Sequence, residues 1–161
     1  MAMKTRSASL LLLPVLMLVC GHAFAQCAGA TFATVNQLNA VLPGHYACGR
    51  KASGPDVPGW NERHVAGGSL VEQHEGGSTV ETVGTWTISG TPNGDATITY
   101  VYTGGQTDLY KAVNAGCTGT GANATCPFGT YTFCGVGGSA PASLQILISS
   151  AAPSLASCPS N

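Results

Sequence analysis

Alternation of apolar and polar side chains is the main pattern in this chain, and it predicts β-strands over most of the sequence after residue 43. Ile98, Tyr100 and Tyr102 share one face of one such segment, while threonines occupy the opposite face. Residues 83–90 and 130–135 repeat this arrangement. Strands of this kind are typical of an antiparallel sheet that covers a core with one face and meets water with the other.

Eight segments carry strand signals, and short Gly-containing turns join nearly all of them. They are residues 44–50, 60–66, 69–75, 83–90, 96–103, 107–113, 130–135 and 143–149. Because eight sequential antiparallel strands leave two unpaired edges unless the sheet closes, we predict a small up-and-down, lipocalin-like β-barrel. A two-sheet β-sandwich is the alternative fold, although the long crossover connections of a sandwich are not evident in the sequence.

One short helix is predicted before the strands, over residues 34–42. Val35, Leu38 and Leu42 fall on one face of this helix, and Thr34 is a suitable N-cap. A helix of this length is marginal on its own, so we expect its apolar face to pack on the barrel.

The start of the chain has the pattern of an export signal. Lys4 and Arg6 precede an apolar run over residues 10–19, and residues 23–25 fit a small-x-small cleavage site before Gln26. We therefore predict an exported protein, periplasmic or secreted, with no membrane span in the mature chain. The chain divides into a signal peptide (residues 1–25), a single β domain (residues 26–150) and an irregular tail (residues 151–161).

The sequence has seven cysteines, and Cys20 lies in the predicted signal peptide. The remaining six suit three disulfides in an oxidising compartment, and six cysteines allow fifteen connectivities. We predict a nested scheme, in which Cys27 pairs with Cys158, Cys48 pairs with Cys134, and Cys117 pairs with Cys126.

Charged residues are scarce, at 8% of the chain, against about 25% in ordinary soluble proteins. After removal of the signal peptide, four basic residues face seven acidic ones, which excludes an electrostatic nucleic-acid binder. Many of the remaining charges gather on the predicted hairpin that joins residues 60–66 to residues 69–75. A functional site is therefore expected there first.

A two-residue turn at Gly67-Gly68 predicts that Arg63 lies opposite Glu72, with Glu62 on the other face from Glu72. The hairpin and the aromatic residues of the later strands supply the candidate ligand-binding residues. These are Trp60, Glu62, His64, Glu72, His74, Trp86, Tyr100 and Tyr102. The aromatic members are candidates to line the barrel interior, which in an eight-stranded barrel is either filled or holds one small ligand.

Catalytic and metal-binding motifs have little support. The chain has no G-x-S-x-G nucleophile motif and no H-x-H or H-E-x-x-H spacing. Glu62, His64, Gln73 and Glu75 form a polar cluster on one predicted face, but zinc requires three or four convergent ligands and no second histidine lies on this face. We therefore predict no catalytic residue, no metal site and no cofactor.

Four short segments resemble a pattern found in small exported proteobacterial proteins of unknown function. They are Trp60-Asn61-Glu62-Arg63-His64, Val83-Gly84-Thr85-Trp86, Thr99-Tyr100-Val101-Tyr102 and Tyr131-Thr132-Phe133-Cys134. The resemblance covers roughly residues 38–135 and implies a bacterial envelope or secreted location, without implying an activity. Gly84-Thr85-Trp86 also resembles the Gly-x-Trp element that lipocalin-type barrels carry on their first barrel strand, whereas here it lies in the middle of the chain.

Three hypotheses for function follow. The leading one is an exported, disulfide-stabilised, non-enzymatic β module that binds a small ligand or a protein partner at the bacterial envelope. The second is a secreted inhibitor or surface-interaction protein that uses its N-terminal segment or an exposed, disulfide-bonded loop such as residues 116–126. The third is a hydrolase that uses Glu62, His64 or Glu72.

Overall fold

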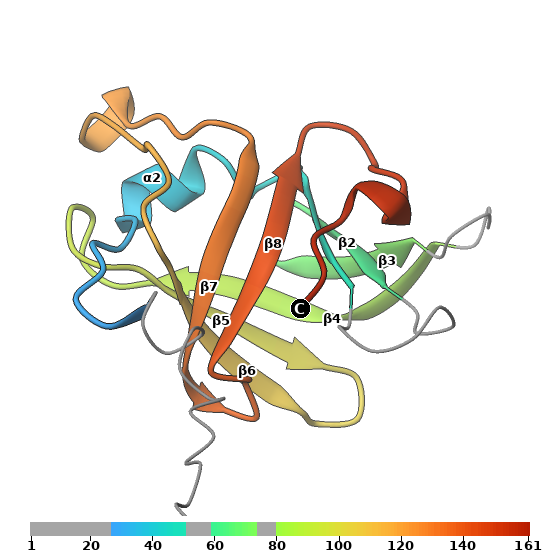
Figure 1. The fold of residues 1–161 in the computed structure, drawn as a ribbon. Coiled ribbons are helices and arrows are strands. Elements are labelled where there is room, and N and C mark those ends of the chain that lie inside the picture. The colour runs from blue at the N-terminus through green and yellow to red at the C-terminus, as the bar shows by residue number, and fades with distance from the viewer. Residues whose placement is uncertain (1–26, 51–58, 74–79) are drawn as a thin grey trace, which may run out of the picture.

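Eight antiparallel strands, neighbours in space in the order of the chain, close into a barrel (Figure 1). This computed structural model describes residues 27–50, 59–73 and 80–161. The strands are β1 (Tyr46–Gly49), β2 (Trp60–His64), β3 (Ser69–Gln73), β4 (Val80–Ser89), β5 (Thr97–Tyr102), β6 (Thr107–Ala112), β7 (Gly129–Gly138) and β8 (Ser143–Ser149). Because β1 also pairs with β8, the sheet closes on itself, which confirms the predicted barrel and excludes the two-sheet sandwich.

The predicted alternation sets which side chains enter the barrel. Trp86 is buried between the exposed Thr85 and Thr87 on β4, and Ile98 and Tyr100 are buried on β5. The bulky face of each strand therefore points inward, and the threonine face points outward, as a half-buried antiparallel sheet requires.

The helix α2 (Val35–Asn39) lies across one end of the barrel (Figure 1). Its first turn is a capping box, in which the Gln37 amide donates to the Thr34 hydroxyl and the Thr34 amide donates to the Gln37 side chain. Leu38 and Leu42 are fully buried and join the core cluster of the barrel. The predicted docking of this apolar face is thus present, and among the described residues no helix is long and apolar enough to span a membrane.

The half of the barrel next to α2 is a packed core. Leu70, Ile98 and Ile148 have no exposed surface there. Trp86 is buried in the same packed layer, and its indole Nε1–H donates to the Val65 carbonyl at 3.2 Å. The other half contains the larger polar and aromatic side chains of the interior, and that half holds the candidate site.

Three disulfides join Cys27 to Cys134, Cys48 to Cys158, and Cys117 to Cys126. The pairing of Cys117 with Cys126 is the predicted one, whereas the predicted Cys27–Cys158 and Cys48–Cys134 pairs are wrong. Cys48 lies on β1 and Cys134 on β7, and β8 lies between these strands. Two strand spacings separate them by about 9.5 Å, beyond the roughly 7 Å that a disulfide spans between Cα atoms. The three disulfides point to an oxidising compartment.

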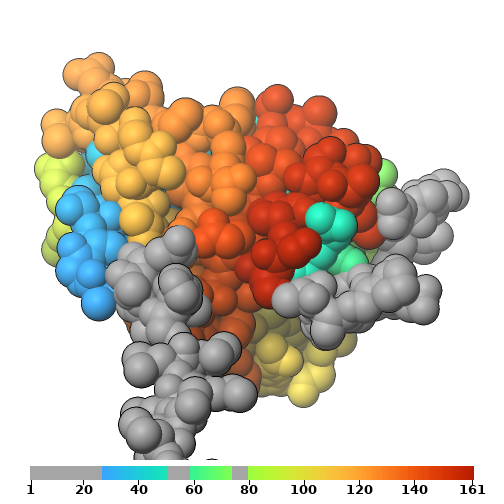
Figure 2. Space-filling view, in the orientation of Figure 1, coloured from blue at the N-terminus to red at the C-terminus, as the bar shows by residue number. Residues whose placement is uncertain are grey.

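The C-terminal segment, residues 150–161, packs against the outside of the barrel at β1. It contains the short 3-10 helix η2 (Leu155–Ser157), and it is held by Cys158 and by a parallel bridge between Arg50 and Ser160. Figure 2 shows this dark red segment on the surface beside the teal residues at the end of β1. Asn161 then reaches the barrel end, where its side-chain Nδ2 donates to the carbonyls of Arg50 and Gln145.

A close approach of Trp60 to Gly49 leads to a test of packing at this end. The two residues are cross-strand partners, and a Cβ atom at Gly49 would overlap the indole ring of Trp60. We expect Gly49→Ala to displace Trp60, to lower the free energy of unfolding by about 1–3 kcal/mol, and to shift the tryptophan fluorescence. Gly137→Ala is the control, because a Cβ there meets Leu109 at an ordinary 3.6 Å. Equal stability of the two variants in urea denaturation would contradict this account.

Candidate functional site

A cavity of about 440 Å³ occupies the half of the barrel away from α2. Its volume lies within the range of roughly 300–1,000 Å³ that is usual for small-molecule sites. Its wall combines acidic and aromatic side chains: Glu62, Glu72, Asp108, Trp60, Tyr100, Tyr102, Tyr110 and Phe133. The interior is therefore hollow at one end and packed at the other.

The register of the β2–β3 hairpin decides which charges face this cavity. Glu62 pairs with Glu72, and Arg63 pairs with Val71, so the predicted pairing of Arg63 with Glu72 is wrong. The reason is a turn one residue longer than predicted, since the Val65 amide donates to the Ser69 carbonyl at 2.9 Å across three intervening residues. This shift places Glu62 and Glu72 on the same inward face, where both line the cavity.

Glu62 is a buried carboxyl group of the cavity, with 7% of its surface exposed. Burial raises its pKa to about 8, and the negative charges of Glu72 and Asp108 act in the same direction. A hydrogen bond with the Tyr102 side chain has the opposite effect on the pKa. Glu62 is therefore mostly protonated at pH 7 in the empty barrel.

Asp108 is a third cavity carboxylate, and it was not among the predicted site residues. It is 5% exposed, and the Gln106 Nε2 donates to its two oxygens at 3.2 and 3.0 Å. Asp108, Tyr110 and Ala112 alternate along β6 and are all buried. The period-two alternation of residues 107–113 could have identified Asp108 from the sequence, because it places Asp108 on the same inward face as Tyr110.

Aromatic rings form a connected array along the cavity wall. The rings of Tyr100 and Tyr102 are stacked, with their centroids 6.2 Å apart. The rings of Tyr100 and Tyr110 pack edge to face, with their centroids 6.0 Å apart. The Tyr110 ring also packs against the Phe133 ring, with a distance of 5.9 Å between centroids. Burial raises the pKa of the Tyr100, Tyr102 and Tyr110 hydroxyls, so these groups stay neutral.

His64 and Trp86, both predicted as ligand-binding residues, lie in the packed layer and do not line the cavity. The fully buried His64 ring contacts Trp86 at 4.9 Å, and its Nε2 lies 2.8 Å from the Tyr100 hydroxyl. Burial lowers the pKa of His64 to about 3, so the ring is neutral. Trp60, Glu62, Glu72, Tyr100 and Tyr102 do line the cavity, while His74 lies outside the described residues.

The predicted polar cluster does not come together as a metal site in the described residues. Within residues 27–50, 59–73 and 80–161, no three His, Cys, Asp or Glu side chains are placed to hold a metal ion. Glu62 and His64 both point into the barrel but at different depths, and Glu75 lies outside the described residues.

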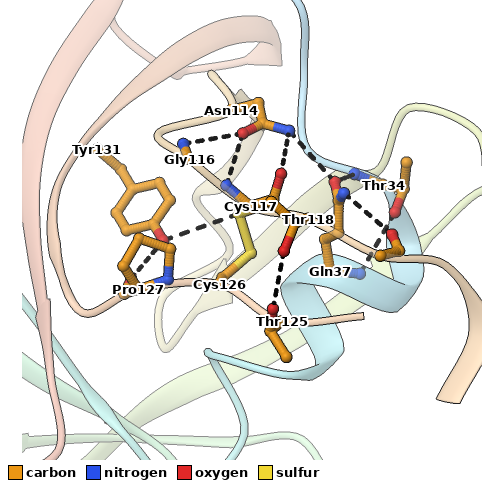
Figure 3. The surroundings of a disulfide bond; sticks show 11 residues. Thr34, Gln37, Asn114, Gly116, Cys117, Thr118, Thr125, Cys126, Pro127 and Tyr131 are labelled. Carbon is orange, nitrogen blue, oxygen red and sulfur yellow. Dashed lines mark hydrogen bonds between the residues drawn. A yellow bond between two sulfur atoms is a disulfide. The ribbon is translucent and has the colours of Figure 1, made fainter. Parts of the chain in front are cut away.

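The disulfide-bonded loop lies at the other end of the barrel, beside α2 (Figure 3). The Asn114 side-chain oxygen accepts from the amides of Gly116 and Cys117, and its Nδ2 lies 3.5 Å from the Gln37 oxygen. The loop continues through the short 3-10 helix η1 (Gly121–Asn123). It is thus tied to α2 and is separate from the cavity.

Comparison with protein-family models, with curated proteins and with solved structures gives no match for this chain. The functional argument therefore starts from the cavity itself. Its parts are a closed β wall, a buried carboxyl group among other acids, and a connected array of aromatic rings.

Proposed function

We propose that this protein is an exported, non-enzymatic binding protein that holds one small molecule inside its barrel. The cavity of about 440 Å³ is the observation that carries this proposal. A chain of this size depends on its core for stability, and an interior left unfilled at one end forgoes packing energy. A ligand that fills the space restores those contacts, which supports a binding role for the hollow half.

The arrangement of the polar groups favours binding over hydrolysis. A hydrolase based on Glu62 and His64 needs both side chains to meet one substrate. His64 is fully buried against Trp86 and Tyr100, and it does not line the cavity. Glu62 therefore faces a ligand without His64 as a catalytic partner.

An oxidising location accords with the three disulfides, and the signal-like pattern of residues 1–25 supports export to the periplasm or the medium. The test is the intact mass of the protein recovered from each cell fraction of a bacterial host. We expect a chain that begins at Gln26 with every remaining cysteine in a disulfide. A full-length, reduced chain confined to the cytoplasm would contradict export.

Binding is tested by screening the folded, oxidised protein against small aromatic molecules of different charge, with thermal shift and tryptophan fluorescence as readouts. Trp60 lines the cavity, so its emission should report occupancy. We expect Ala47→Phe to abolish binding, because Ala47 lines the cavity and a phenyl ring there takes up ligand space.

Thr87→Phe is the matched control for the blocking variant, because Thr87 is exposed on the outside of β4. It adds a ring of the same kind outside the barrel and should leave binding unchanged. If Ala47→Phe does not fold, Ala47→Leu places a smaller added side chain in the same cavity and should weaken binding. Equal binding by the wild type and a folded blocking variant would contradict a site inside the barrel.

A further inference from the structure

Among the described residues that line the cavity, acidic side chains outnumber basic ones. Glu62, Glu72 and Asp108 enter it from β2, β3 and β6. Among the described lining residues, Arg50 is the one cation, and its Nε already donates to the Cys158 carbonyl at 2.8 Å. A positively charged ligand would therefore lower the electrostatic energy of this space, and a negatively charged one would raise it.

Glu62 has no counter-ion among the described groups that shift its pKa, which are two other acids and Tyr102. Carboxylates are rarely buried unless they are paired, because loss of hydration is costly for the ionised form. A glutamine of the same shape would fill the position without that cost. A glutamate at this cavity wall is explained by a cation that arrives with the ligand and forms a charge-assisted hydrogen bond.

The hydrogen-bond donors of the wall are already engaged to a large extent. The amide nitrogen of Gln106 is used by Asp108, and that of Asn161 is used by two backbone carbonyls. The Tyr100 hydroxyl is paired with His64, and Tyr102 is paired with Glu62. The Trp60 indole and the Tyr110 hydroxyl are further donors of the wall, whereas Glu62 and Asp108 supply carboxyl oxygens as acceptors. These oxygens suit an N–H donor on a ligand better than a carboxylate or a phosphate.

The aromatic array supplies the second half of a site for organic cations. Tyr100, Tyr102 and Tyr110 place three contacting rings in the same cavity as Glu62 and Asp108. Ring faces attract ammonium groups, and they also pack against apolar or aromatic bodies. The same surface therefore accommodates both parts of an amine that carries a hydrophobic substituent.

We propose that the cavity selects small organic cations, namely a protonated amine on an apolar or aromatic body. The inference rests on the proposed binding function and gives it a ligand class. In it, Glu62 and Asp108 face the ammonium group, the tyrosine rings enclose it, and the apolar side chains Leu144 and Ile146 contact the ligand body.

The test compares three probes of similar shape by calorimetry at pH 7: 2-phenylethylammonium, 2-phenylethanol and 3-phenylpropanoate. We expect the cation to bind at least about tenfold more tightly than the neutral alcohol, and the anion to bind most weakly. Glu62→Gln should weaken binding of the cation by about tenfold or more and leave the alcohol unchanged. Asp95→Asn removes a carboxylate at an exposed site outside the barrel and should change neither affinity.

A second measurement does not depend on any variant. The groups that face Glu62 are Glu72, Asp108, Tyr100, Tyr102, Tyr110 and, at the cavity end, Arg50. Because Glu62 has a pKa of about 8, cation binding at pH 7 should release close to one proton. The affinity should rise about ninefold from pH 6 to pH 7, while the affinity of the alcohol should not rise.

Two results separate the ligand class from the binding function. If the alcohol or the anion binds as tightly as the cation, or if cation binding releases no proton, selection of cations is overturned while small-molecule binding stands. If none of the three probes binds to protein shown to be folded by near-ultraviolet circular dichroism, both the ligand class and the proposed function are contradicted.

Discussion

Glu62→Gln is expected to raise the free energy of unfolding of the empty protein by about 3 kcal/mol at pH 7. The pKa of Glu62 is about 8 in the folded protein and 4.5 when its environment does not perturb it. A carboxyl group with a raised pKa contributes stability that is complete below pH 4.5 and is lost as the pH rises toward 8. Glutamine has the same shape and does not ionise. The variant therefore keeps the free energy of unfolding that the wild type loses as the pH rises.

Urea denaturation at several pH values measures this effect. The difference between Glu62→Gln and the wild type should be small at pH 4.5, reach about 3 kcal/mol at pH 7 and continue to grow as the pH approaches 8. Asp95→Asn is the control, because the Lys111–Asp95 pair is solvent-exposed and its loss should cost well under about 1 kcal/mol at any pH. A Glu62→Gln protein that is no more stable than the wild type at pH 7 would contradict the raised pKa of the buried Glu62.

His64 gives the same experiment a second signature. The pKa of His64 in the folded protein is about 3, below the ordinary value of 6.5. Its contribution to the free energy of unfolding is therefore complete above pH 6.5 and is lost as the pH falls toward 3. Between pH 4.5 and 6.5 the slopes from Glu62 and His64 have opposite signs and nearly cancel in the wild type. In Glu62→Gln only the His64 slope remains, so stability should rise over this window by about 2–3 kcal/mol. A flat profile in the variant would contradict the neutral, buried state of His64.

A gain in stability from Glu62→Gln together with a loss of cation binding would identify Glu62 as a residue kept for function. Binding sites commonly retain groups that destabilise the empty protein and are satisfied only by the ligand. Both measurements use the Glu62→Gln variant. Urea denaturation reports on the empty barrel, and cation affinity reports on the occupied one. Agreement between them would connect the cost of burying Glu62 to the ligand that removes it.

The strand pattern was readable from the sequence because side chains on a barrel strand alternate with a period of two. Trp86 and Tyr100 were expected inside on that basis, and both are buried. The same period makes register sensitive to the length of a turn. Gly67-Gly68 suggested a two-residue turn, but Ala66 is also part of the turn, and this single residue moves Glu72 to the face of Glu62.

Residues far apart in the chain could not be placed together from sequence patterns alone. Asp108 becomes a neighbour of Glu62 only when closure of the barrel brings β6 to the opposite wall of the cavity. The pairing of Cys48 with Cys158 likewise depends on where the C-terminal segment crosses the outside of β1. Spacing in the sequence favours neither outcome, because both contacts are set by the topology of the closed sheet.

Removal of the Cys48–Cys158 disulfide is expected to lower stability more than removal of the Cys117–Cys126 disulfide. This bond closes a loop with a sequence separation of 110, whereas the separation for Cys117–Cys126 is 9. Since a longer loop loses more chain entropy when it is closed in the unfolded state, the paired substitution Cys48→Ala with Cys158→Ala should cost about 5 kcal/mol. Cys117→Ala with Cys126→Ala should cost about 3 kcal/mol in the same urea denaturation experiment.

The same two variants also separate the two ends of the molecule. Cys158 holds the segment that carries Asn161 to the cavity, and its carbonyl accepts from Arg50, so loss of this disulfide should weaken ligand binding as well as stability. The Cys117–Cys126 loop is tied to α2 at the opposite end, so its loss should leave affinity unchanged wherever the protein is still folded. If the short-loop variant lost affinity and the long-loop variant kept it, the ligand would bind at the end beside α2, and the cavity assignment would be wrong.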